Sequence, residues 1–310
     1  MKMNYAIALH GGAGVIPNDI DQAIKDAYLH GLELALYAGK QILIGGGSAL
    51  EAVEQTVIVL EDYPYFNAGK GSVFTADGEH EMDASIMDGS NLKCGAIAGV
   101  NRIKNPIHLA RKIMEETKHI LLIGDGAMRF AESQSVSMEN DDYFYSEFRY
   151  KQLQQAKSGG KAVLDHSVFE TDRIKKKGTV GAVALDQMGN LAAATSTGGM
   201  TNKRKGRVGD TALIGSGTYA DNRSAAISCT GDGEEFIRHA IAYDVHAQMI
   251  YGNKTLQEAV DFAIHKRLQP DDGGLIAIDS NGLIVCDYNS SGMFRAYSNP
   301  DSGDHIKIWE

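Results

Sequence analysis

The chain is poor in the residues that mark secreted, metal-binding or membrane-spanning proteins. Its 310 residues include three cysteines, Cys94, Cys229 and Cys286, and none of them lies in a Cys-x-x-Cys pair. This usage argues against a disulfide framework and fits a reducing compartment, so we expect a cytoplasmic protein. No apolar run approaches the roughly 18 residues that a membrane-spanning helix needs, so no membrane contact is expected. The N-terminal segment also lacks the basic-then-apolar pattern of a signal peptide.

Positive charge is scarce as well. The chain has 30 lysines and arginines against 40 aspartates and glutamates, a formal net charge of −10. A nucleic-acid partner is therefore not expected, because binding to phosphates needs an extended basic face. The basic cluster at 203–207 is a local patch.

Several motifs of common enzyme classes are missing from the sequence. It contains no Gly-x4-Gly-Lys-Ser/Thr phosphate loop, no Gly-x-Gly-x-x-Gly after a strand, no His-Glu-x-x-His and no Gly-x-Ser-x-Gly elbow. Nucleotide transfer, redox chemistry and zinc hydrolysis thus lose support. One histidine, His10, lies in a glycine cluster, and at a strand end we interpret it as structural rather than catalytic.

Glycine, in contrast, is abundant, with 35 residues that gather in clusters at 11–14, 45–47, 69–71, 198–199 and 231–233. Such clusters indicate tight turns and close backbone approaches. Helical periodicity covers 19–41, 48–61, 106–117, 125–133, 233–250 and 255–267, with a mixed helical segment near 141–156. Strand patterns cover 5–10, 71–74, 82–87, 94–100, 119–123 and 225–229, and two hairpins are predicted at 179–197 and 274–287. This order of short strands and blocks of helices predicts an α+β architecture.

The pair Gly178-Thr179 stands where a polar, irregular stretch (135–178) meets the first hairpin. If the bond between them is cut, Thr179 carries both a hydroxyl and a free α-amine, whose pKa of roughly 7.7–8 suits a general base. The same hydroxyl could make the cut by attacking the carbonyl of Gly178. The alternative reading is a glycine that simply starts a strand.

Candidate partners of Thr179 follow it in the sequence. Because a hairpin that turns near 188–190 brings its open ends together, Thr197 is predicted to lie beside Thr179. Arg207 and Asp210 could hold the α-carboxylate and α-ammonium of an amino acid, although in isolation a surface loop or a mutual ion pair is the favoured interpretation. Thr230 and Gly231 follow a strand and precede a helix, where they could stabilise an oxyanion or form an ordinary turn.

Taken together these segments resemble one family, the plant-type (type III) L-asparaginases, or isoaspartyl peptidases, of the N-terminal-nucleophile hydrolases. The resemblance rests on segments that run nearly from end to end: 9–14, 66–72, 82–89, 178–184, 195–199, 206–210 and 229–234. It covers most of the chain apart from 135–177. The chain departs from the family's frequent Ser-Pro by having Thr211 and Ala212.

The resemblance implies an αββα sandwich, a single domain over 1–310 that is made as a precursor and cuts itself between Gly178 and Thr179. It implies an α subunit of residues 1–178 with a flexible linker at about 157–178, a β subunit of residues 179–310, and an (αβ)2 assembly. It also implies site roles. Thr179 is the nucleophile, Thr197 activates it, and Asn67 orders the nucleophile region. Thr230 and Gly231 form the oxyanion hole, while Arg207, Asp210, Gly231 and Gly233 bind substrate.

The implied activity is hydrolysis of β-aspartyl dipeptides and L-asparagine through a β-aspartyl ester on Thr179, without a catalytic cofactor. A structural sodium ion is implied in the loop 60–70, held by main-chain carbonyls of Leu60, Glu61, Tyr63, Phe66, Ala68 and Lys70. Two alternatives remain: a glycosylasparaginase-like hydrolase, and a non-catalytic homologue that stays uncut.

Overall fold

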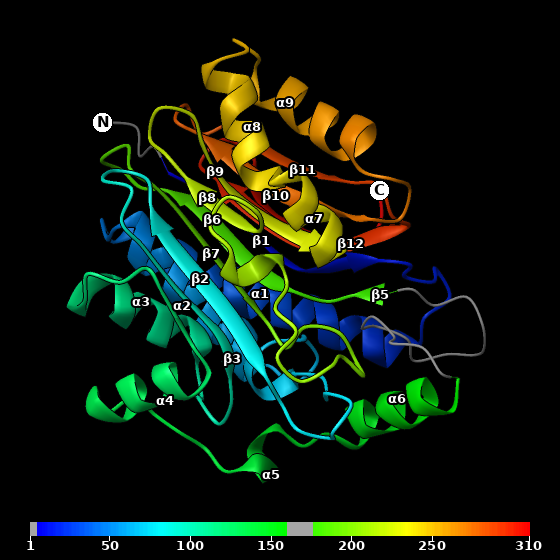
Figure 1. Cartoon of the computed structure of the whole chain (residues 1–310). Helices are drawn as coiled ribbons and strands as arrows, with labels where there is room; N and C mark the ends of the chain where they lie inside the picture. The colour runs from blue at the N-terminus through cyan, green and yellow to red at the C-terminus, as the bar shows by residue number, and fades with distance from the viewer. Residues whose placement is uncertain (1–4, 160–175) are drawn as a thin grey trace.

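The computed structural model describes residues 5–159 and 176–310, and within them the architecture is α+β, as predicted (Figure 1). A nine-stranded sheet has the order β13-β12-β1-β6-β7-β2-β3-β4, with β5 paired to β1. Its strands are β1 (Ala6–Gly14), β2 (Met82–Asp88), β3 (Cys94–Val100), β4 (Leu121–Ile123), β5 (Lys176–Lys177), β6 (Val180–Leu185), β7 (Leu191–Thr197), β12 (Gly292–Asn299) and β13 (Gly303–Lys307). Segments from both ends of the chain thus meet in one sheet.

A four-stranded sheet has the order β11-β10-β9-β8. Its strands are β8 (Thr218–Ala220), β9 (Ala225–Gly231), β10 (Gly273–Asp279) and β11 (Ile284–Tyr288). It packs against the larger sheet, because β9 and β10 contact β1 and β6, and β9 also contacts β7.

Both predicted hairpins are present, one in each sheet, as β6–β7 and β10–β11. Their turns are built alike. Asp186 Oδ1 accepts hydrogen bonds from the backbone N–H groups of Met188 and Asn190, and Asp279 Oδ1 does the same for two turn residues. An aspartate that binds its own turn in this way fixes the register of both strands.

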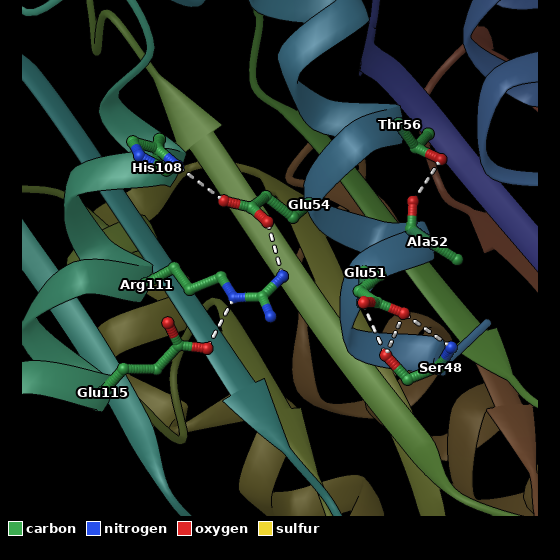
Figure 2. Close-up of polar contacts among 8 residues, drawn as sticks. All are labelled: Ser48, Glu51, Ala52, Glu54, Thr56, His108, Arg111 and Glu115. Atoms are coloured by element: carbon green, nitrogen blue, oxygen red, sulfur yellow. Dashed lines mark hydrogen bonds and ion pairs between the residues drawn. The ribbon is translucent and has the colours of Figure 1, made fainter. Parts of the chain in front are cut away.

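Helices cover the outer face of each sheet (Figure 1). On the large sheet lie α1 (Gln22–Ile44), α2 (Ala49–Asp62), α3 (Pro106–Glu116) and α4 (Gly124–Ser133), and on the small one α7 (Gly233–His239), α8 (Ile241–Ile250) and α9 (Leu256–Phe262). Figure 2 shows how α2 starts and where it is tied down. Ser48 and Glu51 form a reciprocal capping box at its N-terminus, and Glu54 farther along contacts His108 and Arg111 of α3.

Three clusters of buried apolar residues match these interfaces. One lies between the large sheet and α1–α4, a second between the small sheet and α7–α9, and a third, rich in alanine, between the two sheets. The small residues of the third cluster let the two sheets approach closely.

Some sequence predictions of secondary structure were wrong. Residues 71–74 are not a strand, because the loop before them turns through a short 3₁₀ helix, η1 (Gly69–Gly71). The helix predicted at 233–250 breaks at Ala240, whose φ of 47° lies in the left-handed region. Strands β12 and β13 had not been predicted.

Within the stretch 135–178, the helical segment predicted near 141–156 is present as α5 (Asp141–Phe144) and α6 (Glu147–Ser158). Arg149 of α6 is fully buried and donates to the carbonyl oxygens of Gly71 and Tyr65 at 2.9 and 3.0 Å. Most of the linker predicted at about 157–178 lies outside the described residues. Among the described helices, none combines the length and apolar character that a membrane crossing requires.

Candidate functional site

The Gly178-Thr179 bond lies at an interruption of strand pairing. β1 pairs with β6 up to His10–Gly181 and with β5 at Ala13–Lys177. Between these pairs β1 changes register with its other neighbour, β12, between His10 and Gly12, which is a β-bulge. The bond therefore falls between two strand segments, where side chains rather than a neighbouring strand surround it.

Two side chains donate to the carbonyl oxygen of Gly178. Asn67 Nδ2 lies 2.9 Å from this oxygen and Thr197 Oγ1 lies 3.0 Å from it. Asn67 also donates to the Gly199 carbonyl at 2.7 Å, and its own Oδ1 accepts from the Val73 N–H, which fixes the orientation of the amide. Two donors on one carbonyl oxygen polarise the carbon for attack.

The two threonine hydroxyls lie together in the structure. Thr179 Oγ1 donates to Thr197 Oγ1 at 3.1 Å, and both residues are buried. The register of the hairpin causes this, since Val180 pairs with Ser196 one step nearer the turn. The Gly199 N–H donates to Thr197 Oγ1 at 3.0 Å, so this hydroxyl accepts from two groups and donates to the Gly178 carbonyl.

The residues predicted to bind substrate also come together. Asp210 begins the short helix η2 (Asp210–Ala212), and Gly233 begins α7. A β-carbon on Gly233 would lie 2.9 Å from both Arg207 Nη2 and Asp210 Oδ1. Because residue 233 has no side chain, the guanidinium of Arg207 and the carboxylate of Asp210 can both lie close to its backbone.

The structure adds a partner that sequence reasoning missed. Glu234 accepts from Arg207 Nε at 3.0 Å and from Nη2 at 2.5 Å, a bidentate ion pair. Glu234 directly follows Gly233 in the sequence, but nothing in that position reveals which cation it reaches.

The carboxyl of Asp210 is buried, and one of its oxygens lacks a hydrogen-bond partner among the described residues. Burial raises its pKa to about 7, and the Arg207 guanidinium opposes this rise. Its Oδ2 has no hydrogen-bond partner among the described residues. A buried carboxylate oxygen without a partner is costly, so the site favours a ligand that brings a cation or a donor.

Thr230 and Gly231 end strand β9 and lie over β1. Thr230 Oγ1 accepts from the Ala13 N–H at 3.3 Å, and Ala13 pairs with Lys177, one residue before the bond at issue. A β-carbon on Gly231 would lie 2.2 Å from the Asp272 carbonyl oxygen. Thr230 is thus linked through Ala13 to the strand that leads into Gly178.

At the loop 60–70, two glycines lie close against main-chain carbonyls. A β-carbon on Gly69 would lie 2.5 Å from the carbonyl oxygen of Glu61, and one on Gly71 would lie 2.0 Å from that of Phe66. The Glu61 side chain points elsewhere, accepting from Ser196 Oγ at 2.6 Å and from the Ile107 N–H at 3.0 Å. Among the carbonyl oxygens expected to hold sodium, those of Leu60, Tyr63, Phe66 and Ala68 each accept a backbone hydrogen bond.

An α+β protein with a paired threonine hydroxyl beside a polarised peptide carbonyl has the features of a hydrolase that uses a hydroxyl nucleophile. The comparisons agree with this class. The model of the asparaginase family matches residues 3–308, and the chain belongs to that family.

Curated relatives cover nearly the whole chain. The chain is 48% identical over 299 residues to an isoaspartyl peptidase of Salmonella typhimurium, covering 95% of this chain and 96% of that protein. It is 48% identical over 296 residues to an isoaspartyl peptidase of Escherichia coli, covering 94% and 92%. It is 43% identical over 310 residues to an isoaspartyl peptidase/L-asparaginase of Xenopus laevis, covering 99% and 96%.

Proposed function

We propose that the protein cuts itself between Gly178 and Thr179 and then hydrolyses β-aspartyl dipeptides and L-asparagine with the exposed Thr179. The observation that carries this proposal is the contact of Thr197 Oγ1 with both Thr179 Oγ1 and the Gly178 carbonyl oxygen, at 3.1 and 3.0 Å. The names of the relatives support the substrates.

Autocleavage follows from these contacts. Thr179 Oγ attacks the carbonyl carbon of Gly178 while its proton passes to Thr197 Oγ, and the proton of Thr197 neutralises the developing oxyanion. Asn67 Nδ2 stabilises the same oxygen. The C–N bond then breaks as the tetrahedral hydroxyl gives up its proton and the nitrogen takes one. This step frees the α-amine of Thr179 and leaves an ester that links Gly178 to Thr179 Oγ. Water hydrolyses this ester, which releases a carboxylate on Gly178 and restores the free hydroxyl of Thr179.

Substrate hydrolysis uses the same hydroxyl. The α-amine of Thr179, with an ordinary pKa near 8, takes the proton as Oγ attacks the side-chain carbonyl of the aspartyl unit. The leaving amine takes that proton and departs, which leaves a β-aspartyl ester that water hydrolyses. In this proposal Thr230 and Gly231 bind the oxyanion.

Recognition of the aspartyl unit falls to a cation and an anion. Asp210 binds the α-ammonium, which supplies the partner that its buried oxygen lacks. Arg207 binds the α-carboxylate, while Glu234 holds the guanidinium through Nε and Nη2 and so orients it. An α-linked aspartyl peptide has its α-carboxylate in an amide and is therefore rejected.

The fold supports the proposed subunits, residues 1–178 and 179–310, arranged as a single αββα sandwich. In the large sheet β1, from the first part, lies between β12 and β6 from the second, and β7 pairs with β2. Because strands of the two parts alternate, a cut chain stays joined by backbone hydrogen bonds.

Two further features are proposed. A sodium ion would be held by the main-chain carbonyls of Leu60, Glu61, Tyr63, Phe66, Ala68 and Lys70, where it would order the loop that carries Asn67; no reaction step passes through it. For the (αβ)2 assembly, support comes from the exposed apolar side chains of β4, with Leu121 38% and Ile123 61% exposed, which a second copy would cover.

The deciding experiment is intact mass measurement of freshly purified protein, followed over days, with assays on L-asparagine and β-aspartyl-leucine. Two fragments that divide between Gly178 and Thr179, together with hydrolysis of either substrate, are expected. A full-length chain of 33.4 kDa that persists without activity would contradict the proposal and favour the uncut, non-catalytic alternative.

A further inference from the structure

His10 binds the main chain of Thr179, the residue proposed as nucleophile. Its Nδ1 lies 3.0 Å from the carbonyl oxygen of Thr179, and its Nε2 lies 2.9 Å from Ser228 Oγ. The imidazole is fully buried. The bulge in β1 occurs directly after His10, at the point where pairing with β6 ends, so the histidine side chain takes over from the strand ladder.

From Ser228 a chain of hydroxyl contacts continues through the interface of the two sheets. Ser228 Oγ lies 2.7 Å from Thr195 Oγ1, to which Thr218 Oγ1 donates at 2.5 Å. Ser85 Oγ lies 2.8 Å from Thr218 Oγ1 and 2.6 Å from the carbonyl oxygen of Thr211. All of these side chains are fully buried.

The chain of contacts alternates between the two sheets. His10, Thr195 and Ser85 belong to the large sheet, and Ser228 and Thr218 to the small one. Gly181 of β6 leaves room for the contact between His10 and Ser228, since a β-carbon there would lie 2.0 Å from Ser228 Oγ and 2.6 Å from His10 Nε2.

Hydrogen-bond chemistry fixes which groups donate at the two ends of the hydroxyl chain. Burial lowers the pKa of His10 to about 3, against the opposing effect of the Thr179 carbonyl, so the imidazole is neutral and has one N–H. A carbonyl oxygen can only accept, which places that proton on Nδ1 and makes Nε2 an acceptor for Ser228. The opposite end of the hydroxyl chain, the Thr211 carbonyl oxygen, can likewise only accept, so Ser85 donates to it, while Thr218 donates to Thr195.

The far end of the chain holds the turn that carries Asp210. Thr211 follows Asp210 in η2, and its carbonyl accepts from Ser85. Gly217, directly before Thr218, donates its N–H to the Asp210 carbonyl oxygen at 3.2 Å. One buried network thus joins the main chain of the nucleophile to the residue proposed to bind the substrate ammonium.

A purely structural role explains this network poorly. The neighbouring part of the sheet interface is filled by apolar side chains, among which alanine is the most frequent. Buried hydroxyls and an imidazole add little net stability compared with such packing, and each is costly if it loses its partner. The polar residues lie where the two proposed halves of the site meet.

We propose that His10 is a positioning residue for Thr179, and that the Ser228–Thr195–Thr218–Ser85 hydroxyl chain fixes the spacing between the nucleophile and the Asp210 turn. The inference rests on the proposed function. The proposal predicts different effects at the two ends of the hydroxyl chain. Autocleavage needs Thr179 in place but involves no substrate, whereas hydrolysis of a substrate needs both Thr179 and the Asp210 turn in place.

The test uses the full-length protein with one substitution at each end of the hydroxyl chain. Ser228→Ala removes the donor to His10 and is expected to slow both autocleavage and kcat about tenfold. Ser85→Ala releases the Asp210 turn and is expected to raise KM for β-aspartyl-leucine about fivefold, with the autocleavage rate and kcat within twofold of wild type.

Two matched comparisons separate this role from general destabilisation. Thr218→Val should raise KM for β-aspartyl-leucine as Ser85→Ala does. Thr218→Ser, which keeps the hydroxyl, should have the KM of wild type. Thr56→Val removes a buried hydroxyl outside the chain, one that donates to the Ala52 carbonyl within α2 (Figure 2), and should leave every rate within twofold.

The outcomes are distinct. If wild type cuts and hydrolyses but the Ser85→Ala and Thr218→Val proteins match Thr56→Val, the positioning role is wrong while the proposed function stands. If Thr218→Ser shows the same KM as Thr218→Val, the hydroxyl is not responsible and the inference fails, whether or not Ser228→Ala folds. If wild type neither cuts nor hydrolyses, the proposed function fails, and the effects predicted for the hydroxyl chain on autocleavage, kcat and KM fail with it.

Discussion

The side-chain amide nitrogen of Asn67 lies 2.9 Å from the carbonyl oxygen of Gly178, the carbonyl of the bond proposed to be cut. Because the same nitrogen also donates to the Gly199 carbonyl, Asn67 joins the loop 60–70 to the segments on both sides of the nucleophile. The asparagine thus acts on the scissile carbonyl and on the strand end that carries Thr197.

Replacement of Asn67 tests this contact. Asn67→Ala removes one of two donors to the developing oxyanion, and loss of such a donor slows comparable steps on the order of 100-fold. Autocleavage followed by intact mass should slow to that degree. Asn91→Ala, which removes an exposed asparagine that donates to Asp88, is the matched control and should cut at the wild-type rate. Equal rates in the two variants would contradict the role of Asn67.

Replacement of Thr179 tests the nucleophile. Thr179→Ala has no hydroxyl and should remain a single chain of about 33 kDa without activity. Thr179→Ser keeps a hydroxyl and should still yield two fragments, although more slowly, since it lacks the methyl group that restricts χ1. If mass spectrometry detects fragments of the alanine variant, Thr179 is not the nucleophile that makes the cut.

Replacement of Arg207 tests recognition of the α-carboxylate. Arg207→Ala should raise KM for β-aspartyl-leucine on the order of 10- to 100-fold, because a charge-assisted hydrogen bond is lost, while autocleavage is unchanged. Arg223→Ala removes another ion-paired arginine, one whose side chain is 64% exposed, and should have no effect on KM. An unchanged kcat/KM in Arg207→Ala would refute the clamp.

The raised pKa of Asp210 predicts how binding depends on pH. The ionised carboxylate binds the α-ammonium, and with a pKa of about 7 it becomes protonated as the pH falls below neutrality. The inhibition constant of L-aspartate, the product of the proposed reaction, should therefore rise about tenfold per pH unit below 7. A constant that stays flat between pH 5.5 and 8 would exclude Asp210 as the ammonium ligand.

The same carboxyl predicts a change in stability. Its folded pKa of about 7 exceeds the ordinary value of 3.8, so the folded protein holds this proton more tightly than the unfolded chain does. Its contribution to the free energy of unfolding is full below about pH 4 and is lost as the pH rises through about 7. Urea unfolding at pH 5 and pH 8 should show this loss in wild type but not in Asp210→Asn.

Much of the fold was predictable because its signals are local. Both hairpins follow from turn chemistry within a few residues, with Asp186 and Asp279 binding their own turns, and Ser48 with Glu51 marks the start of α2. Residues 71–74 were misassigned because their apolar pattern suits a strand, whereas the close approach of Gly69 to the Glu61 carbonyl and of Gly71 to the Phe66 carbonyl imposes a loop. That approach depends on packing, which periodicity does not report.

The sequence by itself determined the local part of the site. The spacing of a hairpin brings Thr179 and Thr197 together, and the family resemblance pointed to Asn67, Arg207 and Asp210. Only the tertiary structure decided the rest. The pairing of Glu234 with Arg207, and the chain that starts at His10, join residues far apart in the sequence. Hydroxyls on strands look alike in the sequence, and only the packing of one sheet on the other makes partners of them.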